Sequence, residues 1–394
     1  MKIGVDYSAL MTERAGVGEY TYNLIKALLE VDDKNSYMLY VLYSLTSCFL
    51  HPSLKGKIPR IEGADMVYKY IPVPYQLMRY LWLPGMPRCL EEYMLGGLDV
   101  DVVHSTTFSV PRFRDKRKKL VVTIYDLTVL THPDCHKRIN VDHCLGGIKD
   151  AIKYADAIIA ISNHTKADLV NYLKAPEELI TVVHLAAGAE FFEVKDAAIL
   201  SAVRARYKLP ERYILFLGSL EPRKNIKNLL KAYANLKEGT RKEYSLVIAG
   251  AMGWKNNDIS QMIDELALAD KVRFTGYIKS NDLSALYSSA ALFVYPSLYE
   301  GFGLPILEAF ACGCPVITSN VSSMPEVAGD AARLVSPLDV QDITIAMEEM
   351  LGDESLRNMM RMKGFERSAE FTWARCARET LKVYEKAYVA KRRW

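Results

Sequence analysis

Short apolar runs alternate with longer amphipathic segments along almost the whole chain. Runs such as Leu246–Ala249 and Ala157–Ala160 are apolar at every position, so both faces of each predicted strand are expected to be buried. Strands of that kind are typical of parallel sheets that helices cover on both sides. The intervals between the runs, for example Asn225–Leu236 and Gln341–Leu351, predict those helices. The alternation therefore predicts a doubly wound α/β fold.

This α/β pattern occurs twice, once in each half of the chain. The predicted strands of the first half are Lys2–Asp6, Tyr37–Tyr43, Asp101–Ser105, Leu120–Tyr125, Ala157–Ser162 and Ile180–Leu185. Those of the second half are Tyr213–Gly218, Ser245–Gly250, Val272–Gly276, Leu292–Pro296, Pro315–Ser319 and Ala332–Ser336. A polar stretch, residues 188–209, separates the halves. We predict two Rossmann-like domains, residues 1–200 and 201–371, facing each other across a cleft in which ligands bind beyond the carboxyl ends of the strands.

The composition is ordinary for a globular protein and excludes several classes. Hydrophobic residues make up 50% of the chain and charged residues 25%, and a net charge of +3 is too small to favour nucleic acid as a partner. No apolar stretch reaches the roughly 18 residues that a membrane span needs. The N-terminus lacks the pattern of a signal peptide. We therefore expect a cytoplasmic protein.

Several local features leave alternatives open. The basic runs Arg112–Lys119 and Lys391–Arg393 are either solvated surface or a peripheral contact with an anionic membrane or a lipid-linked acceptor. The aromatic segment Tyr75–Pro84 is either core or a membrane-interface element. The 7 cysteines lack the pairing of a disulfide scaffold. Cys-His and His-Cys pairs at residues 135–136 and 143–144 could supply metal ligands, but such adjacency would strain a tetrahedral site, so we expect no metal.

The strongest chemical signal is the string Pro296–Ala309, which reads Pro-Ser-Leu-Tyr-Glu-Gly-Phe-Gly-Leu-Pro-Ile-Leu-Glu-Ala. A buried strand ends at its first residue, a glycine-containing loop follows, and Pro305 suits the first turn of a helix. The backbone N–H groups of Gly301–Leu304 would then point outward near the positive end of a helix, as an anion site requires. The alternative is a capped strand-loop-helix in which Glu300 and Glu308 are merely solvated.

A second motif, Gly218–Asn225, follows the first predicted strand of the second half and opens a helix. It places two adjacent cations, Arg223 and Lys224, at the carboxyl edge of the predicted sheet. An isolated Arg-Lys pair is most simply a solvated surface.

The string Pro296–Ala309 resembles the E-x7-E motif of the family 4 retaining glycosyltransferases, whose members have the GT-B fold. The resemblance extends over nearly the whole chain and includes bacterial mannosyltransferases of surface-polysaccharide assembly. It implies transfer of a hexose, with mannose from GDP-mannose favoured, from a nucleotide-diphosphate sugar to a glycan or lipid-linked acceptor hydroxyl. It also implies retention of the anomeric configuration, with no metal or other cofactor. UDP-glucose and other UDP-sugars remain alternative donors.

The same resemblance implies roles for individual residues. Glu300 would contact hydroxyls of the donor sugar, and Glu308 would accept hydrogen bonds from both ribose hydroxyls. Arg223 and Lys224 would neutralise the donor diphosphate, because preorganised cations stabilise that leaving group as the glycosidic bond breaks. Loop residues would offer backbone N–H groups to the sugar or the diphosphate; they are Gly301, Phe302, Gly303 and Leu304.

At two positions the chain differs from the family pattern. Many members carry Arg directly after the glycine of the second motif, where this chain has Ser219 as a donor-binding candidate. Members commonly have His-Asp where this chain has Tyr125 and Asp126, and that histidine donates a hydrogen bond to the donor sugar. A tyrosine can donate too, but a pKa of about 10 makes it a poor proton shuttle. Asp126 or the nearby His132 could partly take over.

Three other segments match the family by position. Gly16 and Gly18 follow the first predicted strand and resemble a loop that approaches the donor phosphate or the acceptor. Tyr277 and Ile278 follow a strand end where the family reads the nucleotide base through backbone groups. The terminal segment, residues 372–394, resembles the last helix of the family, which packs back on the N-terminal domain.

Some polar residues have mainly structural interpretations. Ser162 suits a helix N-cap, and Ser323–Glu326 has the spacing of a capping box. Asp99–Asp101 matches a D-x-D metal motif but more simply marks the entrance of a strand. His104 either lines the cleft or is a satisfied core histidine.

Two other functions are compatible with the same motifs. One is a nucleotide-sugar epimerase of the same fold, and the other is a non-catalytic nucleotide-sugar binding protein. A nicotinamide oxidoreductase is disfavoured, because no G-x-G-x-x-G sequence follows any predicted strand.

Overall fold

The computed structural model describes residues 1–11, 16–44, 59–71, 97–107, 110, 111, 113, 115, 117–136, 138–250 and 257–391. The chain forms two compact units. The first contains Met1–Leu185 together with Trp373–Trp394, and the second contains Ala186–Thr372. Residues 186–200, which the sequence assigned to the first domain, therefore pack with the second unit. The aromatic segment at residues 75–84 lies outside the described residues.

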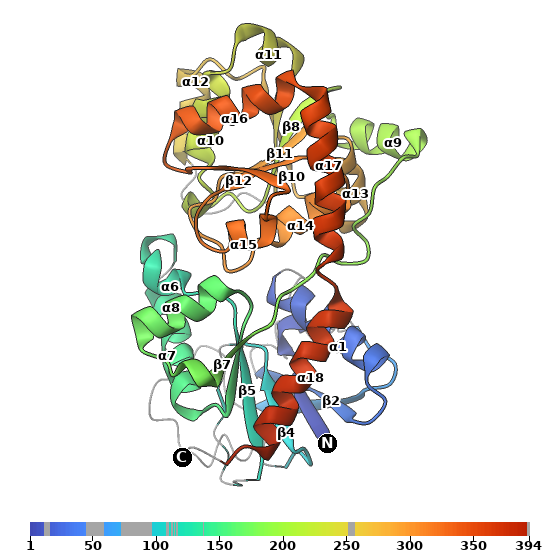
Figure 1. The fold of residues 1–394 in the computed structure, drawn as a ribbon, viewed down its shortest axis with the longest axis vertical. Coiled ribbons are helices and arrows are strands. Elements are labelled where there is room, and N and C mark those ends of the chain that lie inside the picture. Colours follow the sequence, from blue (N-terminus) through green and yellow to red (C-terminus); the bar gives the residue numbers. More distant parts are fainter. Residues whose placement is uncertain are drawn as a thin grey trace. The chain divides into compact units, whose positions relative to one another are not determined.

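The first unit is built on a 7-stranded sheet with the order β3-β2-β1-β4-β5-β6-β7 (Figure 1). Its strands are β1 Lys2–Asp6, β2 Ser36–Ser44, β3 Asp65–Ile71, β4 Val102–Ser105, β5 Lys119–Ile124, β6 Ala157–Ala160 and β7 Ile180–Val182. Every neighbouring pair is parallel. The predicted parallel sheet is thus confirmed for this unit.

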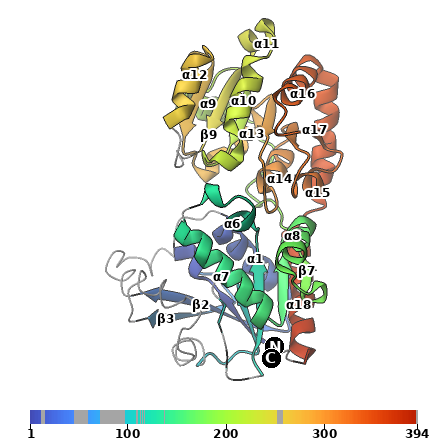
Figure 2. The same cartoon turned by 90° about the vertical axis from the view of Figure 1, so that its left-hand side faces the viewer.

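Strand β3 is the one element of this sheet that the sequence did not predict. Among the described strands it pairs with β2 alone, at the edge of the sheet, which Figure 2 shows on the side away from β7. Its sequence, Asp-Met-Val-Tyr-Lys-Tyr-Ile, contains Asp65 and Lys69, so it does not form a continuous apolar run. An edge strand has only one neighbour, so the signal that identifies a fully buried strand is missing.

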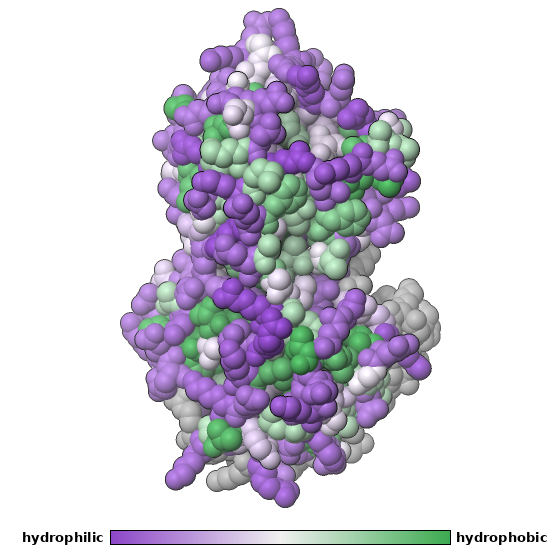
Figure 3. Space-filling view, turned by 45° about the vertical axis from the view of Figure 1, so that its right-hand side comes forward, coloured by the Kyte–Doolittle hydropathy of each residue, from purple (hydrophilic) through white to green (hydrophobic). Residues whose placement is uncertain are grey.

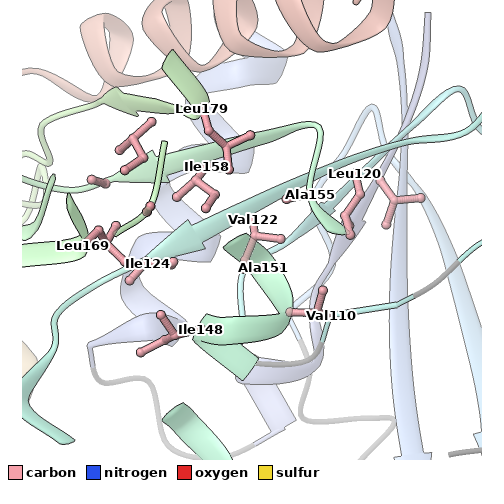
Figure 4. Close-up of a cluster of buried hydrophobic side chains, with 14 of the residues drawn as sticks. Val110, Leu120, Val122, Ile124, Ile148, Ala151, Ala155, Ile158, Leu169 and Leu179 are labelled. Atoms are coloured by element: carbon pink, nitrogen blue, oxygen red, sulfur yellow. The ribbon is translucent and has the colours of Figure 1, made fainter. Parts of the chain in front are cut away.

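Helices cover the sheet of the first unit and bury its side chains. They are α1 Val17–Val31, α6 Thr128–Thr131, α7 Arg138–Tyr154, α8 Asn163–Leu173 and α18 Trp373–Val389, with 3₁₀ turns η1 Ser8–Met11, η3 Pro133–Cys135 and η4 Glu177–Leu179. One core cluster joins β5 and β6 to α7 and α8 (Figure 4). There Val122 and Ile158 face Ile148, Ala151 and Leu169, all of them almost fully buried.

The second unit repeats the same strand order with six strands, β10-β9-β8-β11-β12-β13, again all parallel. The strands are β8 Tyr213–Leu217, β9 Ser245–Ala249, β10 Val272–Gly276, β11 Leu292–Tyr295, β12 Val316–Ser319 and β13 Ala332–Val335. The helices are α9 Ala197–Tyr207, α10 Ile226–Ala234, α11 Glu238–Glu243, α12 Asn257–Glu265, α13 Ser280–Ser288, α14 Leu304–Ala311, α15 Met324–Ala328, α16 Val340–Gly352 and α17 Glu354–Ala369, with the 3₁₀ turn η5 Pro222–Lys224.

Both sheets have the order of a doubly wound fold. The first strand of each unit lies next to its fourth, so β1 neighbours β4 and β8 neighbours β11. The chain winds in one direction from the first strand to the third and in the other from the fourth onwards. The crevice at the carboxyl ends of the first and fourth strands is where open α/β sheets bind ligands.

The C-terminal helix α18 packs in the first unit beside α1 (Figure 1). The hydroxyl of Tyr384 on α18 lies 2.7 Å from Nδ1 of His104 on β4, and Nε2 of His104 lies 2.8 Å from Oγ1 of Thr123 on β5. Lys119 donates from Nζ to the carbonyl of Ala390 at the end of the helix (2.6 Å). Polar contacts therefore fix this helix to two central strands.

His104 is fully buried, and burial lowers its pKa to about 3. Both ring nitrogens have hydrogen-bond partners, so His104 is a satisfied core histidine. Of the two interpretations that the sequence left open, the structural one is correct.

The described helices do not include a membrane span: none of them combines the length and the hydropathy that crossing a bilayer requires. The face in Figure 3 is covered mostly by hydrophilic side chains, with hydrophobic ones among them. The large apolar side chains that are exposed include Leu338, Tyr277 and Val389.

The contact between α18 and β4 gives a first prediction. Tyr384→Phe keeps the ring but leaves Nδ1 of the buried His104 without this partner, which costs about 1–3 kcal/mol. We expect a lower thermal unfolding midpoint, measured by circular dichroism at pH 7. Tyr388→Phe is the control, because Tyr388 lies on the same helix and is 47% exposed. Equal midpoints for the two variants would contradict this role of Tyr384.

Candidate functional site

The candidate site of the second unit lies where the loops after β8 and β11 meet. These strands are neighbours in the sheet, with Leu292 opposite Ile214 and Phe293 opposite Leu215. Their carboxyl ends therefore lie side by side, although they are far apart in sequence. The loop after β8 carries Arg223 and Lys224, and the loop after β11 carries Glu300.

Two glycines allow the loops after β8 and β9 to approach each other. Gly218 donates from its backbone N–H to the carbonyl of Ala249 (3.0 Å), and Gly250 has φ of 135°. A Cβ atom at Gly250 would lie 2.0 Å from the carbonyl oxygen of Gly218. No side chain fits there, so the close approach requires glycine.

Hydrogen bonds hold the loop after β8 against the loop after β11. Leu298 donates from its backbone N–H to the carbonyl of Arg223 (2.9 Å). Asn225, with φ of 60°, donates from its side-chain amide to the carbonyls of Pro296 (3.0 Å) and Pro337 (2.6 Å). The Arg223-Lys224 pair lies in the 3₁₀ turn η5 rather than in a helix, and α10 begins only at Ile226.

Two cations converge on one buried carboxylate. Glu300 accepts a hydrogen bond from Nζ of Lys224 at Oε1 (2.7 Å), and Nη1 of Arg223 lies 2.7 Å from its Oε2. Nη1 of Arg223 also donates to the carbonyl of Tyr299 (2.6 Å). Tyr295, at the end of β11, donates to Oε1 of Glu300 (2.9 Å) and accepts from Nζ of Lys224 (2.5 Å). We call Arg223, Lys224, Tyr295 and Glu300 the charged cluster.

The charges in this cluster determine the ionisation of Glu300. Burial alone would raise the pKa of Glu300, but the neighbouring charges of Lys224 and Arg223 outweigh it and lower the pKa to about 2. Burial lowers the pKa of Lys224, the charge of Arg223 acts in the same direction, and Glu300 opposes both. Glu300 is therefore an ionised carboxylate at neutral pH.

The backbone of the Glu300 loop is fixed by two serines that follow β12. The hydroxyl of Ser322 accepts from the backbone N–H of Glu300 (3.1 Å) and donates to its carbonyl (2.5 Å). The hydroxyl of Ser323 lies 2.8 Å from the carbonyls of both Glu300 and Phe302. The predicted capping box at Ser323–Glu326 is wrong, because Ser323 makes no side-chain cap bond to α15. Its hydroxyl supports the loop instead.

Helix α14 positions the second glutamate of the motif. Its N-cap, Gly303, has φ of 105°, a conformation that favours glycine. Pro305 lies in the first turn, as predicted. Glu308 lies on this helix, where its Oε2 accepts a hydrogen bond from the hydroxyl of Tyr287 on α13 (3.0 Å). Gly301, Phe302 and Gly303 are buried, and Leu304 is half-buried.

The other predicted residues of this unit lie at the same edge of the sheet. Ser219 donates to Oε1 of Glu221 (2.8 Å), whose Oε2 lies 3.6 Å from Nη2 of Arg223. Ser219 thus reaches the charged cluster through Glu221. Tyr277 follows β10 and is 67% exposed, whereas Ile278 is buried.

In the first unit, the predicted residues also follow strands, but their polar groups make local contacts. Gly16, with φ of 49°, is the N-cap of α1, and Gly18 is buried in its first turn. The hydroxyl of Tyr125 donates to the carbonyl of Thr106 (2.8 Å). Asp126 accepts at Oδ1 from the backbone N–H (2.8 Å) and the hydroxyl (2.6 Å) of Thr128.

These contacts bear on the proton-transfer role that the sequence left open. Burial raises the pKa of Tyr125 above its ordinary value, so its phenol stays protonated at neutral pH. Asp126 stabilises the turn before α6, and Nδ1 of His132 lies 3.0 Å from Oγ1 of Thr131. Neither Tyr125 nor Asp126 is held in an ionised cluster like that of Glu300.

Within the described residues, no group of three or more His, Cys, Asp or Glu side chains could hold a metal ion. Asp101 accepts at Oδ2 from the backbone N–H of Lys2 (2.8 Å), and Asp99 pairs with the Lys2 ammonium group. Asp99 and Asp101 thus both contact Lys2, the first residue of β1, and Asp101 directly precedes β4. Ser162 is the N-cap of α8 and accepts from the backbone N–H of Thr165 (3.0 Å), as predicted.

Sequence reasoning missed Tyr295, Tyr287 and Ser322. Tyr295 precedes the string Pro296–Ala309 directly, and within a buried strand it cannot be distinguished from a core aromatic. Tyr287 lies 21 positions before its partner Glu308, and nothing in the local pattern links the two.

Two family models together cover most of the chain. The model described as Glycosyltransferase Family 4 matches residues 14–187, and the model described as Glycosyl transferases group 1 matches residues 203–367. The two matches correspond closely to the two units of the structure.

Known proteins resemble the chain in sequence and in fold. The O-antigen chain mannosyltransferase B of Escherichia coli is 33% identical over 72% of this chain and 74% of its own length. The structure of sucrose-phosphate synthase from Thermosynechococcus elongatus superimposes with a TM-score of 0.76 at 21% identity, covering 98% of each chain. Anabaena HepE, solved in complex with UDP and glucose, gives a TM-score of 0.72 at 15% identity and covers 98% of this chain and 99% of its own.

The charged cluster gives a second prediction. Glu300→Gln leaves the charges of Lys224 and Arg223 uncompensated, and breaking such a buried pair costs about 3–5 kcal/mol. Because the folded-state pKa of Glu300, about 2, is below its ordinary value of 4.5, its stabilisation is complete above pH 4.5. It is lost as the pH falls toward 2. The thermal midpoint of Glu300→Gln should therefore be lower than that of wild type at pH 7, and the two midpoints should converge as the pH falls below 4.5.

Glu243→Gln is the matched control, because it also removes a paired carboxylate. Glu243 pairs with Arg212 at the surface, where its side chain is 47% exposed, and such pairs contribute about 0–1 kcal/mol. A midpoint difference between wild type and Glu300→Gln that stayed constant from pH 7 to pH 3 would contradict the ionisation that we assign to Glu300.

Proposed function

The chain belongs to the glycosyltransferases of family 4 and group 1, and we propose that it transfers a hexose from a nucleoside-diphosphate sugar with retention of configuration. The proposed sugar is mannose, and the proposed acceptor is a hydroxyl of a growing glycan, free or lipid-linked. The proposal includes no metal and no other cofactor. Belonging to the family makes the chain a hexosyltransferase; the donor, the acceptor and the stereochemistry are the proposal.

The observation that carries the proposal is the charged cluster at the switch point of the second sheet. Arg223 and Lys224 are largely buried, adjacent in sequence, and held in place by Glu300 and Tyr295. Cations fixed before the substrate arrives need no reorganisation when negative charge develops. A departing nucleoside diphosphate is a group of this kind, because it gains charge as the glycosidic bond breaks.

Retention fits the groups that the described residues offer. Double displacement needs an enzyme nucleophile, and the sequence shows no obvious one. Front-face attack needs only a positioned acceptor and a stabilised leaving phosphate, which can itself take the acceptor proton. Tyr125 and Asp126, the candidates for an enzyme base, are engaged in local hydrogen bonds. This favours a reaction route that needs no enzyme base. The protein then acts by orientation and charge stabilisation.

The proposed donor is GDP-mannose. The name of the Escherichia coli relative, a mannosyltransferase of the O-antigen chain, supports the sugar. The HepE complex with UDP and glucose supports a nucleoside diphosphate and a hexose as the two parts of the donor, and makes UDP-glucose the principal alternative. In the proposed complex, Glu308 binds the ribose hydroxyls, and Glu300 contacts hydroxyls of the donor sugar. The backbone N–H groups of Gly301–Leu304 bind the sugar or the diphosphate.

A thermal-shift screen tests the donor. A ligand that binds only the folded state increases the free energy of unfolding, by about 2.7 kcal/mol at a ligand concentration of 100 times its Kd, and so raises the unfolding midpoint. We expect GDP-mannose to raise the midpoint more than UDP-, ADP- and dTDP-sugars do, with and without EDTA. If only a UDP-sugar raised the midpoint, the proposed donor would be that UDP-sugar instead of GDP-mannose. A requirement for added metal would contradict the metal-independent part of the proposal.

Substitution of the site tests the catalytic assignment. We expect Lys224→Ala and Glu308→Ala each to lower the rate of transfer at subsaturating donor, and so kcat/KM, by at least about tenfold, which is roughly 1.4 kcal/mol of barrier. The assay is transfer of labelled mannose to an acceptor glycan, with product analysis by NMR to read the anomeric configuration. Lys227→Ala is the control, since Lys227 is an exposed lysine of α10 that pairs with Asp258. Wild-type rates in the first two variants would remove the assignment.

Product analysis without an acceptor separates the remaining functions. A transferase releases free sugar slowly from the donor by hydrolysis. An epimerase converts the sugar, and a binding protein leaves the donor intact.

A further inference from the structure

A stack of three buried aromatic rings lies beneath the candidate site. The rings of Phe293 and Tyr295 on β11 are stacked, with centroids 5.5 Å apart and planes at 21°. Tyr287 on α13 packs edge-on against Phe293, with centroids 5.3 Å apart and planes at 81°. All three side chains are fully buried. Phe293 and Tyr295 lie on the same face of β11 because they are two residues apart in a strand.

Each tyrosine of this stack directs its hydroxyl to one glutamate of the motif. Tyr295 donates to Oε1 of Glu300 (2.9 Å), and Tyr287 donates to Oε2 of Glu308 (3.0 Å). One rigid group of rings is thus bonded to both glutamates.

These hydroxyls are suited to remain donors. Burial raises the pKa of each phenol, and the negative charge of the neighbouring carboxylate raises it further. A neutral phenol facing an ionised carboxylate forms a charge-assisted hydrogen bond, which is about twice as strong as one between neutral groups. Tyr295 also accepts from Nζ of Lys224 and lies under it, with Nζ 4.8 Å from the ring centroid.

Other buried tyrosines in the same unit show what a purely structural hydroxyl does here. Tyr213 donates to the backbone carbonyl of Leu286 (2.6 Å), and Tyr233 donates to that of Tyr244 (2.8 Å). In both tyrosines the buried hydroxyl thus has a backbone carbonyl as its hydrogen-bond acceptor. Tyr287 and Tyr295 differ from them because their partners are the side chains of Glu308 and Glu300.

We propose that Tyr287 and Tyr295 are a pair of positioning residues that set the two glutamates of the site through one buried ring stack. This inference rests on the proposed function, in which Glu308 binds ribose and Glu300 lies among the groups that act on the sugar and its diphosphate. Phe293 fixes both tyrosine rings, and each hydroxyl then fixes one carboxylate.

The two hydroxyls should affect different kinetic constants. Tyr287 acts through Glu308, whose ribose contacts are the same in the bound donor and in the transition state. Losing them weakens binding without slowing the chemical step. Tyr295 acts through Glu300 and Lys224, which face the charge that develops on the leaving group. Losing it lowers turnover.

The experiment compares Tyr287→Phe, Tyr295→Phe and the control Tyr233→Phe, each of which keeps its ring and loses one buried hydroxyl. We expect Tyr287→Phe to raise the donor KM about tenfold and to leave kcat within about twofold of wild type. We expect Tyr295→Phe to lower kcat about tenfold with a smaller change in KM. Tyr233→Phe should change neither constant, although the side chain of Tyr233 is as inaccessible to solvent as those of Tyr287 and Tyr295.

A general loss of stability cannot imitate this pattern. Thermal midpoints of all three variants are measured alongside the kinetics, and assays are run well below the lowest midpoint. If Tyr287→Phe and Tyr295→Phe have the KM and kcat of Tyr233→Phe, the positioning role is overturned. The same holds if both variants change the same constant in parallel.

Binding measurements keep this test separate from the test of the proposed function. Calorimetric titration with GDP and with UDP measures the nucleoside-diphosphate site without any transfer. An active wild type whose KM and kcat survive both substitutions overturns only the positioning role. A wild type that transfers no sugar from any donor overturns the proposed function. The Kd of GDP or UDP for Tyr287→Phe then still decides whether Tyr287 supports Glu308, with an unchanged Kd counting against it.

Discussion

The burial of one ionised carboxylate is the constraint on which the candidate site depends. Glu300 is almost inaccessible to solvent, and removing a carboxylate from water costs several kcal/mol unless partners compensate. Lys224, Arg223 and Tyr295 supply that compensation. These partners come from the loop after β8 and the end of β11, and they reach the loop that carries Glu300 only when β8 and β11 are neighbours. The cluster therefore requires the sheet order, and the cations are in place before any substrate binds.

The burial of the central strands follows from the distribution of apolar residues. Strands that are apolar on both faces are typical of parallel sheets, and in the doubly wound order observed here the first and fourth strands meet inside the sheet. Glycine takes part where the loops after β8 and β9 come too close for a side chain, since a Cβ atom at Gly250 would collide with the backbone of Gly218. Hydrophobic patterning thus determines where the loops meet, and the loop sequences determine what they carry.

Most of the fold was predictable, but the support of the site was not. The doubly buried runs identified the central strands, whereas β3 was missed because Asp65 and Lys69 interrupt its apolar run. The string Pro296–Ala309 identified the loop and helix that carry both glutamates, since motif residues are adjacent in sequence. Tyr287 and Ser323 were missed or misread because their partners are distant along the chain. Ser323 had the spacing of a cap, yet the three-dimensional neighbourhood offered its hydroxyl better-placed carbonyls.

The division of the chain also constrains the order in which the protein can mature on the ribosome. The first unit takes its last helix from residues after Thr372, so it is interrupted by the whole of the second unit. While the chain is being synthesised, β4 must wait for Tyr384 before the buried imidazole of His104 gains that partner. The second unit is continuous and can complete its core earlier. Translation would thus finish the sheet bearing the charged cluster first, although its codons come second.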